Sequence, residues 1–128
     1  MSERVQWITY QGKKILQVDY SSLKDEDEYL AVVDEFEAEA LAHPPGKMMR
    51  ALIDVTGSIL TRRISDRNKE VATKAKKLGI PDSPTAMVGL EGFKMAVAQA
   101  MAFFRPDLYI AESRQAALDW LLAQKIED

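Results

Sequence analysis

The sequence contains no cysteine and only one histidine, His43. The absence of cysteine excludes disulfide bonds, thiolate zinc sites and cysteine nucleophiles. A chain without disulfides suits a reducing compartment, so a cytoplasmic location is expected. His43 lies in the segment "LAHPPG" without a partner at metal-ligand or acid–base spacing, and it is interpreted as a surface residue at a helix end. We therefore expect no metal site, no cofactor and no enzymatic activity.

Strong charge of one sign and long apolar runs are also lacking. The formal net charge is −3, whereas phosphate binding requires a basic surface, so no nucleic-acid partner is expected. The first ten residues, "MSERVQWITY", do not contain an apolar segment of signal-peptide length. The longest apolar-rich stretch, around residues 95–104, is interrupted by Gln99 and is too short to span a bilayer. The sequence thus predicts no integral membrane segment.

The 128 residues suffice for one domain with a full hydrophobic core, and we expect a single domain over residues 1–128. Runs rich in β-branched residues, amphipathic stretches and turn signals predict the element order β-β-α-β-α-β-α-β-α. The predicted strands occupy residues 4–10, 14–20, 48–55, 85–90 and 107–111. The predicted helices occupy residues 25–43, 65–78, 91–104 and 113–125, with Ser113 as the cap of the last one.

This order predicts an α/β fold with a single mixed, mostly parallel sheet and helices on its faces. Strands that alternate with helices require crossover connections, which produce parallel strands. Only the first two strands, joined by the short loop "QGK", are expected to form an antiparallel hairpin. The nearly continuous apolar content of residues 48–55 indicates a strand covered on both faces of the sheet.

Four segments, taken in order, resemble the SpoIIAA-like proteins, which are relatives of the STAS domain (sulfate transporter and anti-sigma factor antagonist) and have been compared with CRAL-TRIO lipid carriers. They are "GKKILQVDYSSL", "ALIDVTG", "AMVGLEGFKMAVAQAMAFF" and "AESRQAALDWLLAQ". The resemblance implies a small bacterial domain with four or five strands that acts by docking to proteins. In partner-switching STAS proteins, a kinase phosphorylates a serine in a motif that opens the second helix. Here that segment reads "RRISDRNKE" and offers Ser65, without the motif's second hydroxyl residue and glycine.

The segment from the third predicted strand into the second predicted helix contains the candidate regulatory or partner-binding residues. Ligands of open parallel sheets bind beyond the carboxyl ends of the strands, which is where this segment is expected. Two interpretations remain open: a docking or phosphorylation site, or a simple connection in which Gly57 supplies a turn, Thr56 caps local backbone and Ser65 caps the helix. The candidate residues are Asp54, Thr56, Gly57, Ser58, Arg62, Arg63, Ser65 and Arg67.

Charge is distributed very unevenly between the first two predicted helices. Residues 25–39 contain eight acids and no base, whereas residues 62–77 contain seven bases and two acids. These could be two solvated faces. Alternatively, the basic helix of one molecule meets an acidic partner or the acidic helix of a second copy, because complementary charge steers and specifies association.

The third predicted helix, residues 91–104, is apolar nearly all round. It is expected either to pack between the sheet and a neighbouring element or to form the wall of a pocket for an apolar small molecule or lipid, since Met and Phe adapt to irregular ligands. The candidate pocket residues are Phe93, Val97, Met101 and Phe104. The leading hypothesis is therefore a non-catalytic domain that docks to a protein partner or to itself as a homodimer. The alternative is a small-molecule or lipid-binding domain.

Overall fold

The computed structural model describes residues 3–44, 46–91, 95 and 107–126, and it shows one five-stranded mixed sheet with the strand order β1-β2-β3-β4-β5. The mixed α/β fold predicted from the sequence is confirmed. The strands are β1 (Val5–Tyr10), β2 (Lys13–Asp19), β3 (Ala51–Asp54), β4 (Thr85–Val88) and β5 (Leu108–Ile110). The helices within the described residues are α1 (Glu26–Ala42), α2 (Arg62–Lys77) and α4 (Arg114–Ala123).

The predicted hairpin is present, and its turn explains its register. Gln11 and Gly12 both have positive φ angles, 48° and 81°, which is the conformation of a two-residue type I′ turn. This turn suits the right-handed twist of the two strands. β1 and β2 pair without interruption from Tyr10 opposite Lys13 to Val5 opposite Val18. β2, β3, β4 and β5 are parallel to one another, as the crossover pattern predicted.

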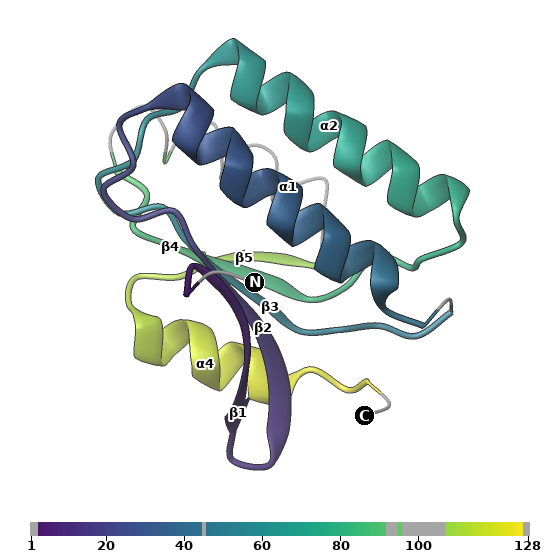
Figure 1. Cartoon of the computed structure of the whole chain (residues 1–128). Coiled ribbons are helices and arrows are strands. Elements are labelled where there is room, and N and C mark those ends of the chain that lie inside the picture. The colour runs from purple at the N-terminus through teal and green to yellow at the C-terminus, as the bar shows by residue number, and fades with distance from the viewer. Residues whose placement is uncertain (1–2, 45, 92–94, 96–106, 127–128) are drawn as a thin grey trace.

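Helices cover both faces of the sheet (Figure 1). α1 and α2 lie side by side on one face, and α4 lies on the other. Successive residues of the central strand β3 point to opposite faces, so Ile53 packs into the core under α1 and α2 while Leu52 packs into the core under α4. The apolar residues of β3 are thus covered from both sides, as expected, but the strand is shorter than the predicted 48–55 and Met48 is 41% exposed.

α2 begins three residues earlier than the sequence predicted. Its N-cap is Thr61, whose hydroxyl accepts a hydrogen bond from the Ile64 amide at 3.2 Å. Ser65 therefore lies inside the helix, and the prediction that it caps α2 was wrong. The physical reason is the position of the buried side chains, because Ile64 and Val71 both belong to the helix and face the core. The prediction for Ser113 is confirmed, since its side chain accepts from the Ala116 amide at 3.1 Å.

The third predicted helix lies largely outside the described residues. The candidate pocket residues Phe93, Val97, Met101 and Phe104 all fall there, so the apolar pocket stays a prediction. Across the part of the chain that the structure describes, none of the helices has the length and apolar character needed to cross a membrane.

Candidate functional site

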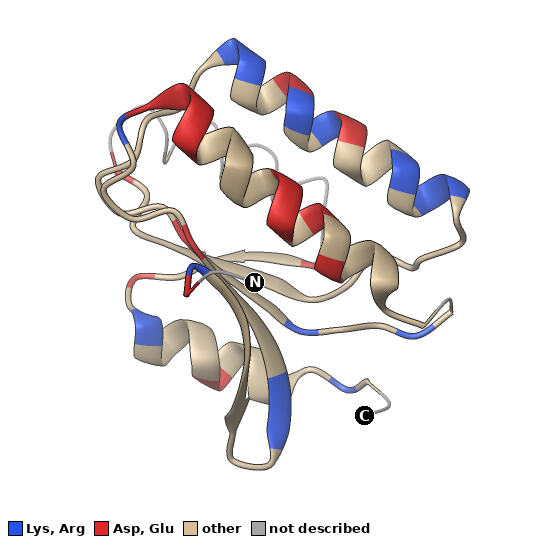
Figure 2. Cartoon of the chain, viewed as in Figure 1, with Lys and Arg blue, Asp and Glu red and all other residues tan. Residues whose placement is uncertain are grey.

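The acidic helix α1 and the basic helix α2 contact each other within one chain (Figure 2). α1 connects β2 to β3 and α2 connects β3 to β4, and successive right-handed crossovers that proceed in one direction place both helices on the same face of the sheet. The sequence predicted either solvated faces or a contact between molecules. The structure shows instead that much of the opposite charge is paired inside the molecule.

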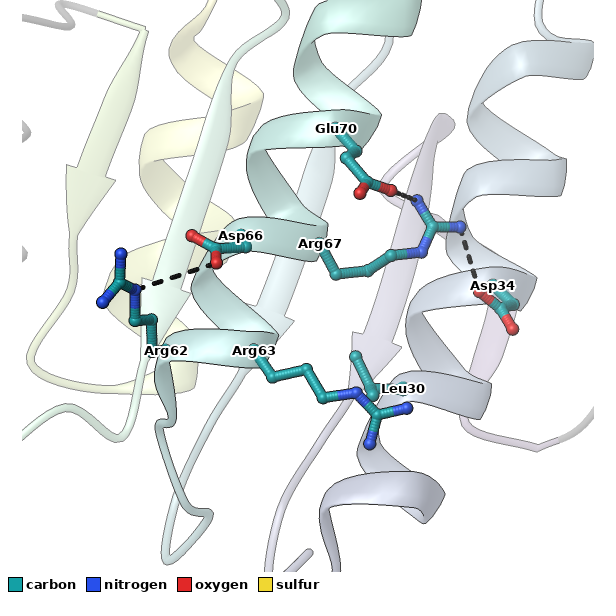
Figure 3. Close-up of a pocket in the computed structure, with 7 residues that line it drawn as sticks. All are labelled: Leu30, Asp34, Arg62, Arg63, Asp66, Arg67 and Glu70. Atoms are coloured by element: carbon teal, nitrogen blue, oxygen red, sulfur yellow. Dashed lines mark hydrogen bonds and ion pairs between the residues drawn. The ribbon is translucent and has the colours of Figure 1, made fainter.

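An open groove of about 550 Å³ runs along the first half of this helix pair (Figure 3). Most of its lining side chains are charged, and several of them are paired with one another. The described part of the chain holds no group of three or more His, Cys, Asp or Glu residues that could bind a metal ion. The groove is lined by Leu30, Asp34, Arg62, Arg63, Asp66, Arg67 and Glu70.

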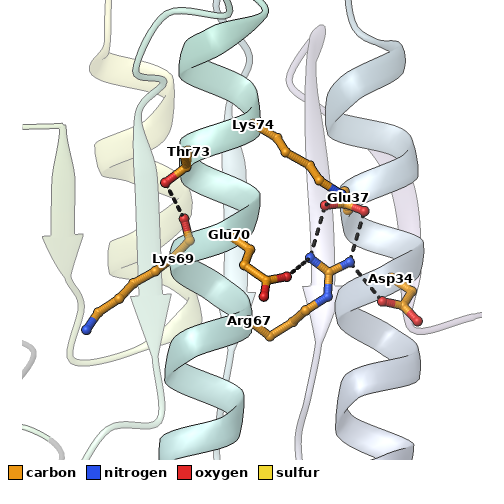
Figure 4. Close-up of polar contacts among 7 residues, drawn as sticks. All are labelled: Asp34, Glu37, Arg67, Lys69, Glu70, Thr73 and Lys74. Carbon is orange, nitrogen blue, oxygen red and sulfur yellow. Dashed lines mark hydrogen bonds and ion pairs between the residues drawn. The ribbon is translucent and has the colours of Figure 1, made fainter.

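Arg67 is the centre of the charged contacts (Figure 4). Its two terminal nitrogens donate to the two carboxylate oxygens of Glu37 at 3.0 and 2.9 Å, and one of them also donates to Asp34 at 2.9 Å. Lys74 adds a contact to Glu37 at 3.4 Å. The hydrogen bond from Arg67 is the main reason why the pKa of the Glu37 carboxyl is below its usual value. Arg67 therefore holds α2 against α1, and its guanidinium has few N–H groups left to bind a ligand.

A second set of contacts joins the N-terminal ends of the same helices. Arg63 donates to Glu26 and to Asp27, each at 3.0 Å. A hydrogen bond with the Thr61 side chain, followed by the hydrogen bond from Arg63, lowers the pKa of Glu26. Thr61 thus connects the start of α2 with the start of α1, in addition to capping α2.

The loop between β3 and α2 has a conformation fixed by its own hydrogen bonds. The Asp54 carboxylate accepts from the Thr56 amide at 2.9 Å and from the Thr56 hydroxyl at 2.6 Å. Gly57 has a φ angle of 68°, which favours glycine, and the buried Ser58 hydroxyl donates to the Val55 carbonyl at 2.9 Å. These residues shape the turn, as one of the two interpretations predicted. The prediction that Thr56 caps local backbone was wrong, because the Asp54 carboxylate binds the Thr56 amide and the Thr56 hydroxyl binds that carboxylate.

Neighbouring segments hold this loop in place from two sides. The Ser22 amide donates to the Thr56 carbonyl at 2.8 Å, and the Ile59 amide donates to the Leu23 carbonyl at 3.0 Å. On another side, Gly89 approaches Thr56 so closely that a Cβ atom on Gly89 would lie 2.5 Å from the Thr56 nitrogen. The backbone of the loop between β3 and α2 is therefore held in one conformation.

Two exposed side chains of different character lie where this loop passes into α2. Leu60 is 47% exposed, although it is a large apolar residue. The side chain of Arg62 is 94% exposed, and its carboxylate contact, with Asp66, has a length of 4.0 Å. Arg62 is thus the arginine of the predicted set whose guanidinium remains available to a partner.

Two lysines that the sequence analysis did not single out continue the surface from Arg62. Residues seven positions apart lie nearly on the same side of an α-helix, so Arg62, Lys69 and Lys76 form one row along α2. All three are exposed, and no carboxylate among the described residues pairs with Lys69 or Lys76. We call Arg62, Lys69 and Lys76 the basic row. The spacing of seven was the signal in the sequence that could have identified it.

The predicted site residues thus differ in what they do. Asp54, Thr56, Gly57 and Ser58 build the loop. Arg63 and Arg67 hold α1 and α2 together. Ser65 lies half-buried within α2, and Arg62 points to solvent. His43, which was expected to be a surface residue, contacts the Met48 carbonyl through Nε2 at 3.1 Å and stacks on the Trp7 ring.

The chain was compared with known proteins. No family model matches it, and no curated protein matches it. A solved structure from Shewanella loihica PV-4, described as an uncharacterized protein of the DUF3478 family with a SpoIIAA-like fold, matches with a TM-score of 0.70 at 21% identity. The match covers 91% of each chain.

Two further solved structures match over nearly the whole chain. A variant of RsbS from Moorella thermoacetica gives a TM-score of 0.54 at 18% identity, covering 94% of this chain and 96% of that one. An anti-sigma-factor antagonist (STAS) domain protein from Planctomyces limnophilus gives 0.55 at 12% identity, covering 93% and 98%. At these identities the likeness concerns the fold, and the chain has the SpoIIAA-like fold of STAS domains.

Proposed function

We propose that this protein is a non-catalytic docking domain that binds an acidic segment of a protein partner. The segment would lie against Leu60 and along the basic row. The observation that carries the proposal is the exposure of Arg62, 94% for the side chain, at the start of α2 and two positions after the 47% exposed Leu60. One of the proteins with the same fold is described as an anti-sigma-factor antagonist, a protein named for its action on another protein, which supports a docking role.

The geometry suits an elongated acidic ligand. Fourteen residues separate the two ends of the basic row, which corresponds to about 21 Å at 1.5 Å per residue. A helix with Asp or Glu at every seventh position presents carboxylates at the same interval. The loop is fixed before binding, so little conformational entropy is lost there on association. Complementary charge would accelerate the encounter and select acidic partners.

The environment of the loop's polar groups also favours docking over catalysis. The Ser58 hydroxyl is buried and donates to a backbone carbonyl, so it is not activated as a nucleophile. The Asp54 carboxylate already accepts two hydrogen bonds from Thr56, which suits a turn-forming residue. The loop therefore offers contact surface and fixed backbone, which docking requires.

A fluorescent peptide with glutamate at every seventh position is a suitable probe. Its binding would be measured by anisotropy at several salt concentrations, next to the same peptide with glutamine in place of glutamate. We expect binding of the glutamate peptide alone, with an affinity that falls as salt rises. The variant Arg62→Glu should weaken binding by about tenfold or more.

The control for charge is Arg114→Glu on α4, which changes the net charge equally on the opposite face of the sheet. The apolar contact is tested by Leu60→Ser, which should weaken binding without a change in net charge. The matched control is Met48→Ser, because Met48 is 41% exposed and lies outside α2 and the loop that precedes it. Equal effects of Arg62→Glu and Arg114→Glu would show a general charge effect and contradict the proposed site.

A further inference from the structure

β1 is an edge strand without the usual protections against pairing with another strand. Within the described residues it pairs only with β2, so its other side is open. The strand reads "VQWITY", without a charged residue, proline or glycine, and its six residues pair with β2 without a bulge. Edge strands are normally protected by lysine, proline, a bulge or short length. The opposite edge, β5, has three residues and is protected by its shortness.

The hydrogen-bond ladder shows which backbone groups of β1 point outward. The Asp19 amide donates to the Arg4 carbonyl at 2.7 Å, so these two residues form a hydrogen-bonded pair. Such pairs alternate with non-hydrogen-bonded pairs along an antiparallel ladder. With the observed register, the N–H and C=O groups of Val5, Trp7 and Thr9 therefore point away from β2.

We propose that β1 pairs in antiparallel fashion with β1 of a second copy of the chain, centred on Trp7. In this register Trp7 faces the Trp7 of the other copy and Val5 faces its Thr9. All outward N–H and C=O groups of the three residues are then bonded, through about six hydrogen bonds in total. The sheet continues from one copy into the other. A register shifted by two residues leaves some of these groups without partners.

The occupant is a second copy because the edge is complementary to itself. A two-fold axis brings the same surface of both molecules together, so a charged strand would place like charges near one another. Val5–Tyr10 carries no charge, and in the proposed register Arg4 faces Tyr10. The carboxylate of Glu39, which lies beside Trp7, accepts a hydrogen bond from the Trp7 ring at 3.1 Å. On one face of the sheet, Ile8 lies opposite Gln6 of the other copy.

Cysteine cross-linking tests the register directly, since the chain contains no cysteine. Residues 6 and 8 of different copies form a non-hydrogen-bonded pair, with Cα atoms about 4.5 Å apart, which is within the range of a disulfide. The double variant Gln6→Cys, Ile8→Cys should form a covalent dimer on mild oxidation, visible on a non-reducing gel. The matched control is Gln6→Cys alone, whose cysteine faces Ile8. Absence of the dimer from the double variant, or equally fast cross-linking of the control, overturns the proposal.

Sedimentation of the full chain provides a second measurement. Thr9→Pro removes an outward N–H that makes no bond to β2, so the monomer should keep its circular dichroism spectrum while dimerisation weakens by about tenfold. Thr9→Ser retains the amide and should dimerise like the unmodified chain. Since the strand is uncharged, dimerisation should not fall with salt, unlike docking of an acidic peptide. An unmodified chain that stays monomeric at about 0.5 mM, where weak pairing is populated, contradicts the proposal.

Discussion

Arg67 of α2 and Glu37 of α1 form a two-bond pair whose side chains are 19% and 16% exposed. A planar guanidinium matches the two oxygens of a carboxylate, so this geometry fixes the relative position of the two helices as well as attracting them. Ion pairs on the open surface contribute little because water and salt screen them. This pair is better shielded, and it is the principal polar connection between the helices.

Replacing Arg67 should therefore destabilise the protein measurably. We expect Arg67→Met to lower the free energy of unfolding by about 1–2 kcal/mol, because Glu37 loses both hydrogen bonds. Arg67→Lys should lower the free energy of unfolding by a substantial part of this amount, since an ammonium group cannot make the two-bond contact with Glu37. Urea denaturation at neutral pH measures both changes. Arg62→Met, at a side chain that is 94% exposed, is the control and should have little effect.

The same pair predicts how stability depends on pH. Arg67 lowers the pKa of Glu37 from its usual 4.5 in the folded chain. The resulting stabilisation is present above the unfolded pKa and is lost as pH falls through the lower, folded pKa. The stability difference between the unmodified chain and Arg67→Met should thus be large at pH 7 and shrink below about pH 4. Urea denaturation across this range measures it, and a difference that grows on acidification would contradict this origin.

Thr61 and Ser65 provide a test of where α2 begins. Thr61→Ala removes the side-chain oxygen that accepts from Ile64 and also bonds Glu26, and it should lower the free energy of unfolding by about 1 kcal/mol or more. Ser65→Ala lies inside the helix, where alanine has the higher helix propensity, so it should be neutral or slightly stabilising. Thermal unfolding of the two variants gives the comparison. A larger loss of stability for Ser65→Ala than for Thr61→Ala would indicate that α2 begins at Ser65.

Gly89 should not tolerate a side chain, because of its contact with Thr56. Gly89→Ala places a Cβ atom 2.5 Å from the Thr56 nitrogen and should cost about 2 kcal/mol or more. The φ angle of Gly46 is 80°, close to the 88° of Gly89, but a Cβ atom on Gly46 meets nothing within 4 Å. Gly46→Ala should therefore lower the free energy of unfolding by only about 1 kcal/mol. Chemical denaturation measures both values. Equal losses would show that backbone strain alone is responsible.

The sequence predicted the architecture well because the pattern of apolar residues directly reflects burial in strands and helices. The turn at Gln11 and Gly12 and the cap at Ser113 use local signals, which a sequence displays. Local signals were ambiguous at α2, where Thr61 and Ser65 are both good caps and only the burial of Ile64 decides between them.

The pairing of charges could not be predicted from residue counts. Whether an arginine on one helix meets a carboxylate on another depends on which elements lie side by side and how each helix is rotated. Glu37 shows this, since Phe36 packs against the core whereas Glu37, the next residue, faces Arg67. Of the predicted arginines, only geometry separates Arg62, which points to solvent, from Arg63 and Arg67, which are paired within the chain.

The sheet order β1-β2-β3-β4-β5 repeats the order in which the strands occur along the chain. Each newly synthesised strand therefore finds its neighbour already made, and no strand has to insert between two earlier ones. Growth on the ribosome can add strands one at a time from the hairpin onward, with α4 closing the second face last.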